Sequence, residues 1–417
     1  MRPLPTAPSR RSAGVDPAAD AAALLRRVGF ATLMVVLPSL ALVTRRGLVV
    51  LAPIGVALLV IASFLDGQHR PLRVTAWRLT ASRAGLAAGL AALWCALSLV
   101  WTPFLSPAAE RLFNIAATVG VAFAGVFALP DRMRSANLYL LPVGVGLAAL
   151  VAIGVALVVP GARDGTDEAA QNLGRGLVVL ALFVWPAVAW LRSRHRDLEA
   201  LGLAVAVAFA AVLGPDAMPV IALGIGAAVY ALVAAAPALG VRVTAAGMAG
   251  LLAVAPLLPF VGRPLSALIL GPSHPITHSL AIWRRLVLSE PVRLITGHGF
   301  ETALRGRFVG LLHPNAPSTL LLEVWYELGI VGALAGAVAL WAAVRRAGRE
   351  HPVLLPGITA AFATAYAFAC LGIGTAQMWW FTALSLLVLV FVANERGQFR
   401  TTRPKAVLFN RVAANDR

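Results

Sequence analysis

The sequence predicts an all-α, polytopic integral membrane protein with about twelve transmembrane helices and one large loop on the outer side. Of its 417 residues, 59% are hydrophobic and only 13% are charged, whereas soluble domains carry about 25% charged residues. Apolar runs of membrane-spanning length recur along the chain, and short arginine clusters separate them. The net charge of +17 is therefore distributed as topology signals rather than as one basic patch, and we expect no nucleic-acid partner.

The two ends of the chain differ in composition from the predicted transmembrane domain at 28–393. Residues 1–27 are rich in Pro and Ala with mixed charge, and we expect a disordered cytoplasmic tail. A second span follows the first apolar run closely, which favours an uncleaved first helix over a signal peptide. Residues 394–417 form a basic tail, which we also expect in the cytoplasm.

Each predicted span is an apolar run close to the ~20 residues that cross a bilayer. The run at 28–43 is short for a span. The runs at 199–213 and 217–235 are separated only by the sequence GPDA, so a single broken helix is an alternative there. The predicted spans are 28–43, 47–65, 82–101, 112–129, 137–159, 175–191, 199–213, 217–235, 241–261, 319–342, 354–371 and 377–393.

The positive-inside rule orients these spans. With the N-terminus in the cytoplasm, most of the 35 basic residues fall in cytoplasmic segments. Both termini are then cytoplasmic, and the large loop at 262–318 lies outside. The pair Arg45 and Arg46 fits this alternation poorly, because it falls in a short outer loop.

Ionisable residues are nearly absent from the span interiors. Ion-coupled transporters place such residues at bilayer depth, so their scarcity favours binding or chemistry at the membrane face. Cys95 and Cys370 lie inside apolar runs, where free cysteines act as small core residues. The seven histidines show no metal-ligand spacing. We therefore expect neither a metal nor a cofactor.

The loop at 262–318 has the features of a structured segment. Residues 278–288, HSLAIWRRLVL, form an amphipathic helix that suits an interface, and Pro291 would end it. The sequence TGHGFETALRGR follows. Arginines bind phosphates in bidentate fashion, so the loop cations are candidates for a diphosphate site, with lipid headgroups or loop carboxylates as alternatives. The candidates are Arg284, Arg285, His298, Arg305 and Arg307.

The segment 313–334, HPNAPSTLLLEVWYELGIVGAL, leads from the loop into a span. His313 is a candidate base, because histidine exchanges protons near neutral pH, although a surface role is an alternative. Asn315 is the predicted N-cap of the helix. Glu323 and Glu327 lie one turn apart on one face. We expect them to orient loop cations or to favour the positive end of the helix.

These two segments together resemble the O-antigen ligase and O-antigen polymerase superfamily. The family signature is a His-Asn pair followed by Glu-x-Gly-x-x-Gly, with a Gly-x-Gly-Phe-like turn before it. The sequence QNLGRGLVVLALFVWP at 171–186 is also similar to an earlier outer helix entry of the family, and it contains Arg175. The matching signature residues are Glu327, Gly329 and Gly332, and Gly297, Gly299 and Phe300.

The resemblance implies a membrane-embedded glycosyltransferase of the C type in the inner membrane. Such an enzyme uses undecaprenyl-diphosphate-linked glycans as donors on the periplasmic face and needs no metal. Ligases pass the glycan to lipid A-core of lipopolysaccharide, and polymerases pass it to another lipid-linked repeat. The implied partners are thus a lipid-linked glycan donor, a glycan or lipid acceptor, and membrane lipid.

In the family, a loop histidine and several arginines serve the acceptor hydroxyl and the diphosphate leaving group. Ser318 stands eleven residues before Gly329, where the family has its histidine. Ser318, the nearby His313, and Glu327 are therefore the catalytic candidates that the resemblance implies. Arg175 is the nearest candidate for an outer arginine of the family. A transporter or flippase of lipid-linked or small solutes, and a non-catalytic relative of the ligases, are the alternative functions.

Overall fold

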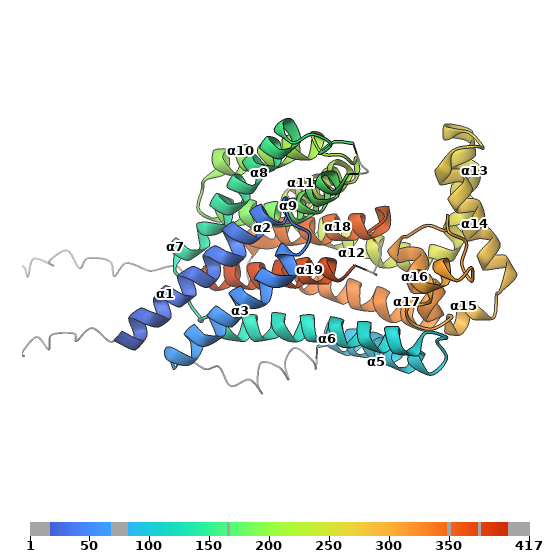
Figure 1. The fold of residues 1–417 in the computed structure, drawn as a ribbon, viewed down its shortest axis with the longest axis horizontal. Coiled ribbons are helices and arrows are strands. Elements are labelled where there is room, and N and C mark those ends of the chain that lie inside the picture. Colours follow the sequence, from blue (N-terminus) through green and yellow to red (C-terminus); the bar gives the residue numbers. More distant parts are fainter. Residues whose placement is uncertain (1–16, 68–81, 165–166, 348–351, 374–376, 399–417) are drawn as a thin grey trace, which may run out of the picture.

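A computed structural model of the chain describes residues 17–67, 82–164, 167–347, 352–373 and 377–398, and all regular structure in them is helical (Figure 1). Ten helices in these ranges are long and apolar enough to cross a membrane, or up to eleven if one bent pair is a single span. The predicted all-helical, polytopic class is confirmed at this level. The tail residues 1–16 and 399–417 lie outside the described residues.

The first span begins earlier than predicted. It consists of α1 (Pro17–Ala31), a π-helical segment (Thr32–Val36) and α2 (Leu37–Leu40). The expectation of disorder up to residue 27 was therefore wrong from Pro17 onward. Its Ala- and Leu-rich sequence favours helix, and α1 packs along α3 (Gly47–Leu65). A Cβ on Gly29 of α1 would lie 3.1 Å from the Gly55 carbonyl oxygen of α3, so the two helices approach closely.

The next helices surround a buried central helix. That helix is α9 (Glu168–Ser193), which begins seven residues before the predicted 175 and is buried along most of its length. Its neighbours include α8, α10, α18 and α19. The preceding helices are α5 (Arg83–Leu97), a 3-10 turn (Ser98–Val100), α6 (Leu105–Ala128), α7 (Ser135–Leu138) and α8 (Leu140–Val158).

The middle of the chain departs most from the predicted spans. The GPDA sequence does separate two helices, α10 (Asp197–Val212) and α11 (Met218–Ala235). However, α10 has 16 residues and is shorter than the usual spanning range of about 17–25. The predicted span 241–261 is wrong as a continuous helix, because α12 (Pro237–Ala253) ends there and α13 (Leu258–Leu270) leaves it at 65°. A 3-10 turn (Ala255–Leu257) joins the two helices, and Pro256 in it has no amide hydrogen to donate to the Leu252 carbonyl, which explains the break.

The last helices carry the structured loop and its anchor. In Figure 1, α13 to α16 gather at one end of the bundle, which we call the loop end, and α1 begins at the opposite end. The long helix α17 (Leu320–Arg346) runs from the loop end and packs against α5 and α12. The remaining elements are α14 (Pro275–Ser289), α15 (Arg293–Thr296), α16 (Thr302–Phe308), a 3-10 turn (Pro352–Leu354), α18 (Leu355–Leu371) and α19 (Met378–Arg396).

Two main apolar clusters hold this arrangement together, beside a third and smallest one of Ala245, Met248 and Val344. The larger one surrounds α9, and the smaller one lies beneath the loop, where Trp283 of α14 and Trp325 of α17 are buried. The indole of Trp325 donates to the Leu252 carbonyl of α12 at 2.7 Å, which satisfies its polar atom. Asn315 was wrong as the N-cap of α17. The hydroxyl of Thr319 accepts from the Leu322 amide instead, so Thr319 is the cap.

Candidate functional site

The loop crosses a break in α17, and this loop crossing joins residues 295–299 to residues 326–329. Gly329 has φ +62° and ψ −160°, which interrupts the helix. The interruption leaves carbonyl oxygens of α17 that accept no hydrogen bond from an amide of the same helix. The His298 amide donates to the Tyr326 carbonyl at 2.8 Å, and the Gly299 amide donates to the Glu327 carbonyl at 2.9 Å. The break in the helix therefore becomes the docking point of the loop.

Glycine is required on both sides of the loop crossing. A Cβ on Gly297 would lie 2.2 Å from the Glu327 carbonyl oxygen, and one on Gly329 would lie 2.4 Å from the Ile295 carbonyl oxygen. Both glycines also have positive φ, which other residues rarely adopt. On the far side, the Trp94 indole of α5 donates to the Leu328 carbonyl at 2.8 Å. The two sequence motifs therefore meet in space because each supplies backbone that the other contacts.

Three buried carboxylates lie around the loop crossing. Glu301, Glu323 and Glu327 are each only 2–3% exposed. The Ala303 amide at the start of α16 donates to Oε1 of Glu327 at 3.0 Å. Glu323 lies 3.7 Å from the Arg307 guanidinium, which also donates to the Pro317 carbonyl at 3.0 Å. Glu323 therefore contacts a loop cation directly, as predicted, whereas Glu327 accepts a hydrogen bond from the loop backbone.

Arg111 of α6 contacts the loop, although no sequence pattern indicated it as a site residue. Its guanidinium forms a buried ion pair with Glu301 and lies 5.2 Å from the centre of the Phe300 ring. Glu301 also pairs with Arg305 at 3.5 Å and has φ +71°, an uncommon value for glutamate. Sequence reasoning placed Arg111 in a short outer loop, because the span there was predicted to start at residue 112. A helix that begins earlier and carries charged residues in its first turns would have placed Arg111 on α6.

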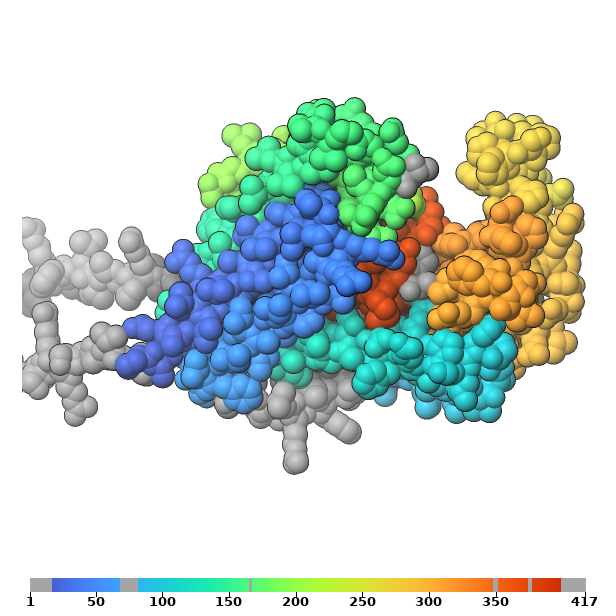
Figure 2. Space-filling model, viewed as in Figure 1, coloured from blue at the N-terminus to red at the C-terminus, as the bar shows by residue number. Residues whose placement is uncertain are grey.

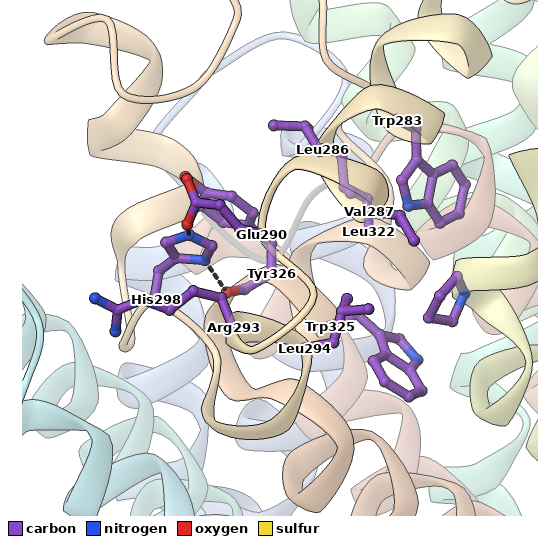
Figure 3. Close-up of a pocket in the computed structure, with 11 residues that line it drawn as sticks. Trp283, Leu286, Val287, Glu290, Arg293, Leu294, His298, Leu322, Trp325 and Tyr326 are labelled. Atoms are coloured by element: carbon purple, nitrogen blue, oxygen red, sulfur yellow. Dashed lines mark hydrogen bonds and ion pairs between the residues drawn. The ribbon is translucent and has the colours of Figure 1, made fainter.

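The side chain of His298 lies in a pocket between α14 and α17 (Figure 3). Its ring stacks on Tyr326 with the ring centres 4.1 Å apart. Nδ1 lies 3.0 Å from the Tyr326 carbonyl oxygen, which only accepts hydrogen bonds, so Nδ1 carries a proton. Nε2 lies 2.9 Å from a Glu290 carboxylate that is 57% exposed. A carboxylate only accepts hydrogen bonds, so this contact places a proton on Nε2 as well, and both ring nitrogens donate.

The rest of this pocket combines apolar and cationic surface. Arg293 and Glu290 lie on its rim beside His298. The walls come from α14 and α17 and are largely apolar, and they consist of Trp283, Leu286, Val287, Leu322 and Trp325. The cavity has room of only about 30 Å³, so it can admit a small polar group such as a hydroxyl or a water beside His298.

Several predicted residues lie away from these contacts. Arg284 packs over the Phe260 ring at 5.5 Å, and Arg285 is exposed on α14. His313 is exposed, and its Nδ1 accepts from the Asn315 amide of its own turn at 3.1 Å. Ser318 is exposed just before the N-cap of α17. Arg175 lies on α9, where its charged neighbours are Arg45 and Glu168.

The structure thus brings five of the ten predicted site residues to the loop crossing or its pocket. They are Glu323, Glu327, His298, Arg305 and Arg307. Among the described residues, no group of three or more His, Cys, Asp or Glu side chains is arranged to hold a metal ion.

No protein-family model matches this chain, and no curated protein matches it. The likeness to the O-antigen ligases and polymerases therefore rests on two short motifs, which the structure joins at the loop crossing.

The hydrogen bond from Trp94 to α17 is expected to support the loop crossing modestly. Trp94→Phe keeps the apolar ring but leaves the Leu328 carbonyl without its donor. We expect a loss of about 1–3 kcal/mol in the free energy of unfolding, the usual cost of an unsatisfied buried polar group. Unfolding of the purified protein in detergent measures this loss. Phe123→Leu on the exposed face of α6 is the control and should change little. An equal effect of both changes would contradict the role of the bond.

Proposed function

We propose that this protein transfers or polymerises an undecaprenyl-diphosphate-linked glycan at the periplasmic face of the inner membrane, as O-antigen ligases and polymerases do. One observation carries the proposal. Loop arginines held by buried carboxylates lie at the loop end of a bundle of membrane-length helices, beside a histidine in a largely apolar pocket. A membrane-embedded glycosyltransferase of the C type would need this combination at one membrane face.

The arginines suit the leaving group of such a reaction. In the transfer, the acceptor hydroxyl oxygen bonds to the anomeric carbon of the donor glycan, and the bond from that carbon to the diphosphate breaks. Negative charge then develops on the diphosphate, and preorganised cations stabilise it. Arg305 is 48% exposed while Glu301 holds it from the buried side. Arg307 is paired with Glu323 but is only 13% exposed, so Arg305 is the more accessible of the two cations.

His298 suits the acceptor side of the reaction. Both ring nitrogens face acceptors in this structure, Nδ1 the Tyr326 carbonyl and Nε2 the Glu290 carboxylate. Once Nε2 has lost its proton and the exposed Glu290 side chain has turned away, Nε2 can accept the proton of an attacking hydroxyl. The exposed Glu290 carboxylate, 2.9 Å from Nε2, would stabilise the imidazolium that forms. His298 differs from His313 in that residues of other elements hold its ring, whereas Nδ1 of His313 accepts from the Asn315 amide of its own turn.

The test is the surface-polysaccharide profile of a deletion strain complemented with single variants. We expect loss of the gel ladder in the deletion strain, recovery with the wild-type chain, and no recovery with His298→Ala or Arg305→Ala. His313→Ala and Ser318→Ala should restore the ladder and serve as matched controls from the same loop. Recovery with His298→Ala but not with His313→Ala would move the base to His313.

Other outcomes would replace the proposal. An unchanged ladder in the deletion strain would contradict a role in this glycan. Purified protein that moves a lipid-linked oligosaccharide across vesicles without joining glycans would establish a flippase. If the purified protein alone joined donor and acceptor glycans, the non-catalytic alternative would be excluded.

A further inference from the structure

A groove lies between α3, α6 and α19, on helices other than those of the His298 pocket. Figure 2 shows the red surface of α19 recessed between blue α3 and cyan α6. The helices α3 and α19 contribute residues from their ends nearest the loop end, and α6 contributes residues from its middle turns. The lining includes Val49 and Val56 of α3, Asn114 and Val121 of α6, and Met378 and Leu389 of α19.

The walls of this groove are more apolar than the residue types suggest. The hydroxyls of its two threonines donate to backbone carbonyls of their own helices. Thr118 donates to the Asn114 carbonyl, and Thr382 donates to the Met378 carbonyl. What they present to the groove is then mainly methyl surface. The remaining lining residues on α3 and α6 are alanine, proline and valine apart from Asn114. A hydrocarbon chain is the chemistry that such walls accept.

The groove has the depth of one leaflet. Its lining runs from Met378 to Leu389 on α19, from Asn114 to Ala122 on α6 and from Val49 to Val56 on α3, which is about 16, 12 and 10 Å at 1.5 Å per residue. The hydrocarbon core of a bilayer is about 30 Å thick, so one leaflet occupies about 15 Å. The groove begins at the end of α19 nearest the loop end. An acyl chain from the leaflet on that side would fill it.

Unpaired arginines lie at the mouth of the groove. Arg46 is the N-cap of α3, and Val49 in the first turn of that helix lines the groove. Arg45 and Arg46 are exposed, and neither has an ion-pair partner within the residues that the structure describes. Arg45 is also an electrostatic neighbour of Arg175 on α9. Three cations and one carboxylate, Glu168, therefore lie where a lipid headgroup would lie, and the net charge there is positive.

This position also accounts for the exception in the arginine distribution. Outer loops are normally poor in basic residues, yet Arg45 and Arg46 occur together in one. A binding role gives them a reason to be there. Arginine forms paired hydrogen bonds with phosphate oxygens, and the positive end of α3 adds to the attraction.

We propose that the α3/α6/α19 groove binds one anionic phospholipid from the leaflet at the loop end, with an acyl chain in the groove and the phosphate on Arg45, Arg46 and Arg175. The amide of Asn114, near the mouth, would contact the ester region. The groove matches one leaflet in depth, which favours an acyl chain over the much longer chain of a polyprenyl carrier. This site is independent of the proposed glycan transfer.

Native mass spectrometry of the purified full-length chain tests the proposal, with dioleoyl phosphatidylglycerol and dioleoyl phosphatidylcholine as probes. We expect one retained phosphatidylglycerol and little retained phosphatidylcholine. The double variant Arg45→Glu/Arg46→Glu should bind phosphatidylglycerol at least about 30-fold more weakly, as expected for two surface arginines. Arg163→Glu, an exposed arginine in a neighbouring outer loop, is the control and should bind normally.

A second pair of variants tests the groove itself. Ala117 lines the groove, whereas Ala116 is exposed beside it on the same helix. Ala117→Trp should prevent lipid retention, and Ala116→Trp should not, with both proteins eluting as single species. Equal binding of the two lipids, or normal binding by Arg45→Glu/Arg46→Glu, would overturn the proposal. So would stoichiometric displacement by undecaprenyl phosphate, or a dimer that Ala117→Trp dissociates, because each assigns the groove to another occupant.

Discussion

Gly329→Ala is expected to undo the loop crossing and, with it, to abolish the proposed glycan transfer. The backbone of Gly329, at φ +62° and ψ −160°, lies in a region that only glycine populates freely. The added Cβ would lie 2.4 Å from the Ile295 carbonyl oxygen, so the loop must also move. Backbone strain and overpacking together should lower the free energy of unfolding by about 2–6 kcal/mol. The measurements are unfolding of the purified protein and the surface-glycan ladder of the complemented deletion strain.

Gly336→Ala is the matched control for this change. It lies on the same helix, and the nearest atom to its added Cβ is a Leu252 side-chain carbon at 3.4 Å. We expect nearly unchanged stability and a full glycan ladder, because the contact is ordinary packing and alanine favours helix. If Gly329→Ala and Gly336→Ala behaved alike, the loop crossing would not have the role that we assign to it.

Arg111→Met is expected to have a comparably large effect on stability. The change leaves Glu301 buried without its main cation. Removing one partner of a buried ion pair commonly costs about 3–5 kcal/mol. The free energy of unfolding should fall by this amount in the purified protein. Glycan transfer should fall as well, because Glu301 also positions Arg305.

A double variant separates the fold from the chemistry at this pair. Glu301→Gly removes the second charge and suits the positive φ of that position. Combined with Arg111→Met, it should recover most of the lost stability without restoring glycan transfer. Arg192→Met breaks an exposed ion pair with Asp197 and should cost at most about 1 kcal/mol. A loss in Arg111→Met no larger than in Arg192→Met would show that the buried pair is dispensable.

Most of the helical framework was predictable because apolar length is a local property. The predicted span 47–65 coincides with α3, and the runs that became α11, α17 and α19 were placed within a few residues. Helix starts that contain charged residues were harder to predict, because hydropathy scores the first turns of α1, α6 and α9 as polar. The bend inside the predicted span 241–261 was not predictable in this way, because tertiary packing sets the 65° angle between the two helices.

The candidate site was predictable in part. The paired motifs pointed to the 297–300 turn and to Glu327 and Gly329, since each is a short local pattern. His313 and Ser318 were chosen by spacing along the chain, whereas the structure holds the ring of His298 more tightly through Tyr326 and Glu290. The partners of a side chain come from other segments that pack against it, so the spacing of residues along the chain does not predict them.

The sequence by itself determined that the chain is a bundle of membrane-length helices with a structured loop, because apolar length and arginine placement act locally. Only the tertiary structure decided which charges meet. Arg111 and Glu301 are 190 residues apart in the chain, and their pairing depends on how α6 and the loop pack together. The same holds for the α3/α6/α19 groove, whose three walls come from distant parts of the chain. Burial then fixes these contacts, because a charge removed from water must have a partner.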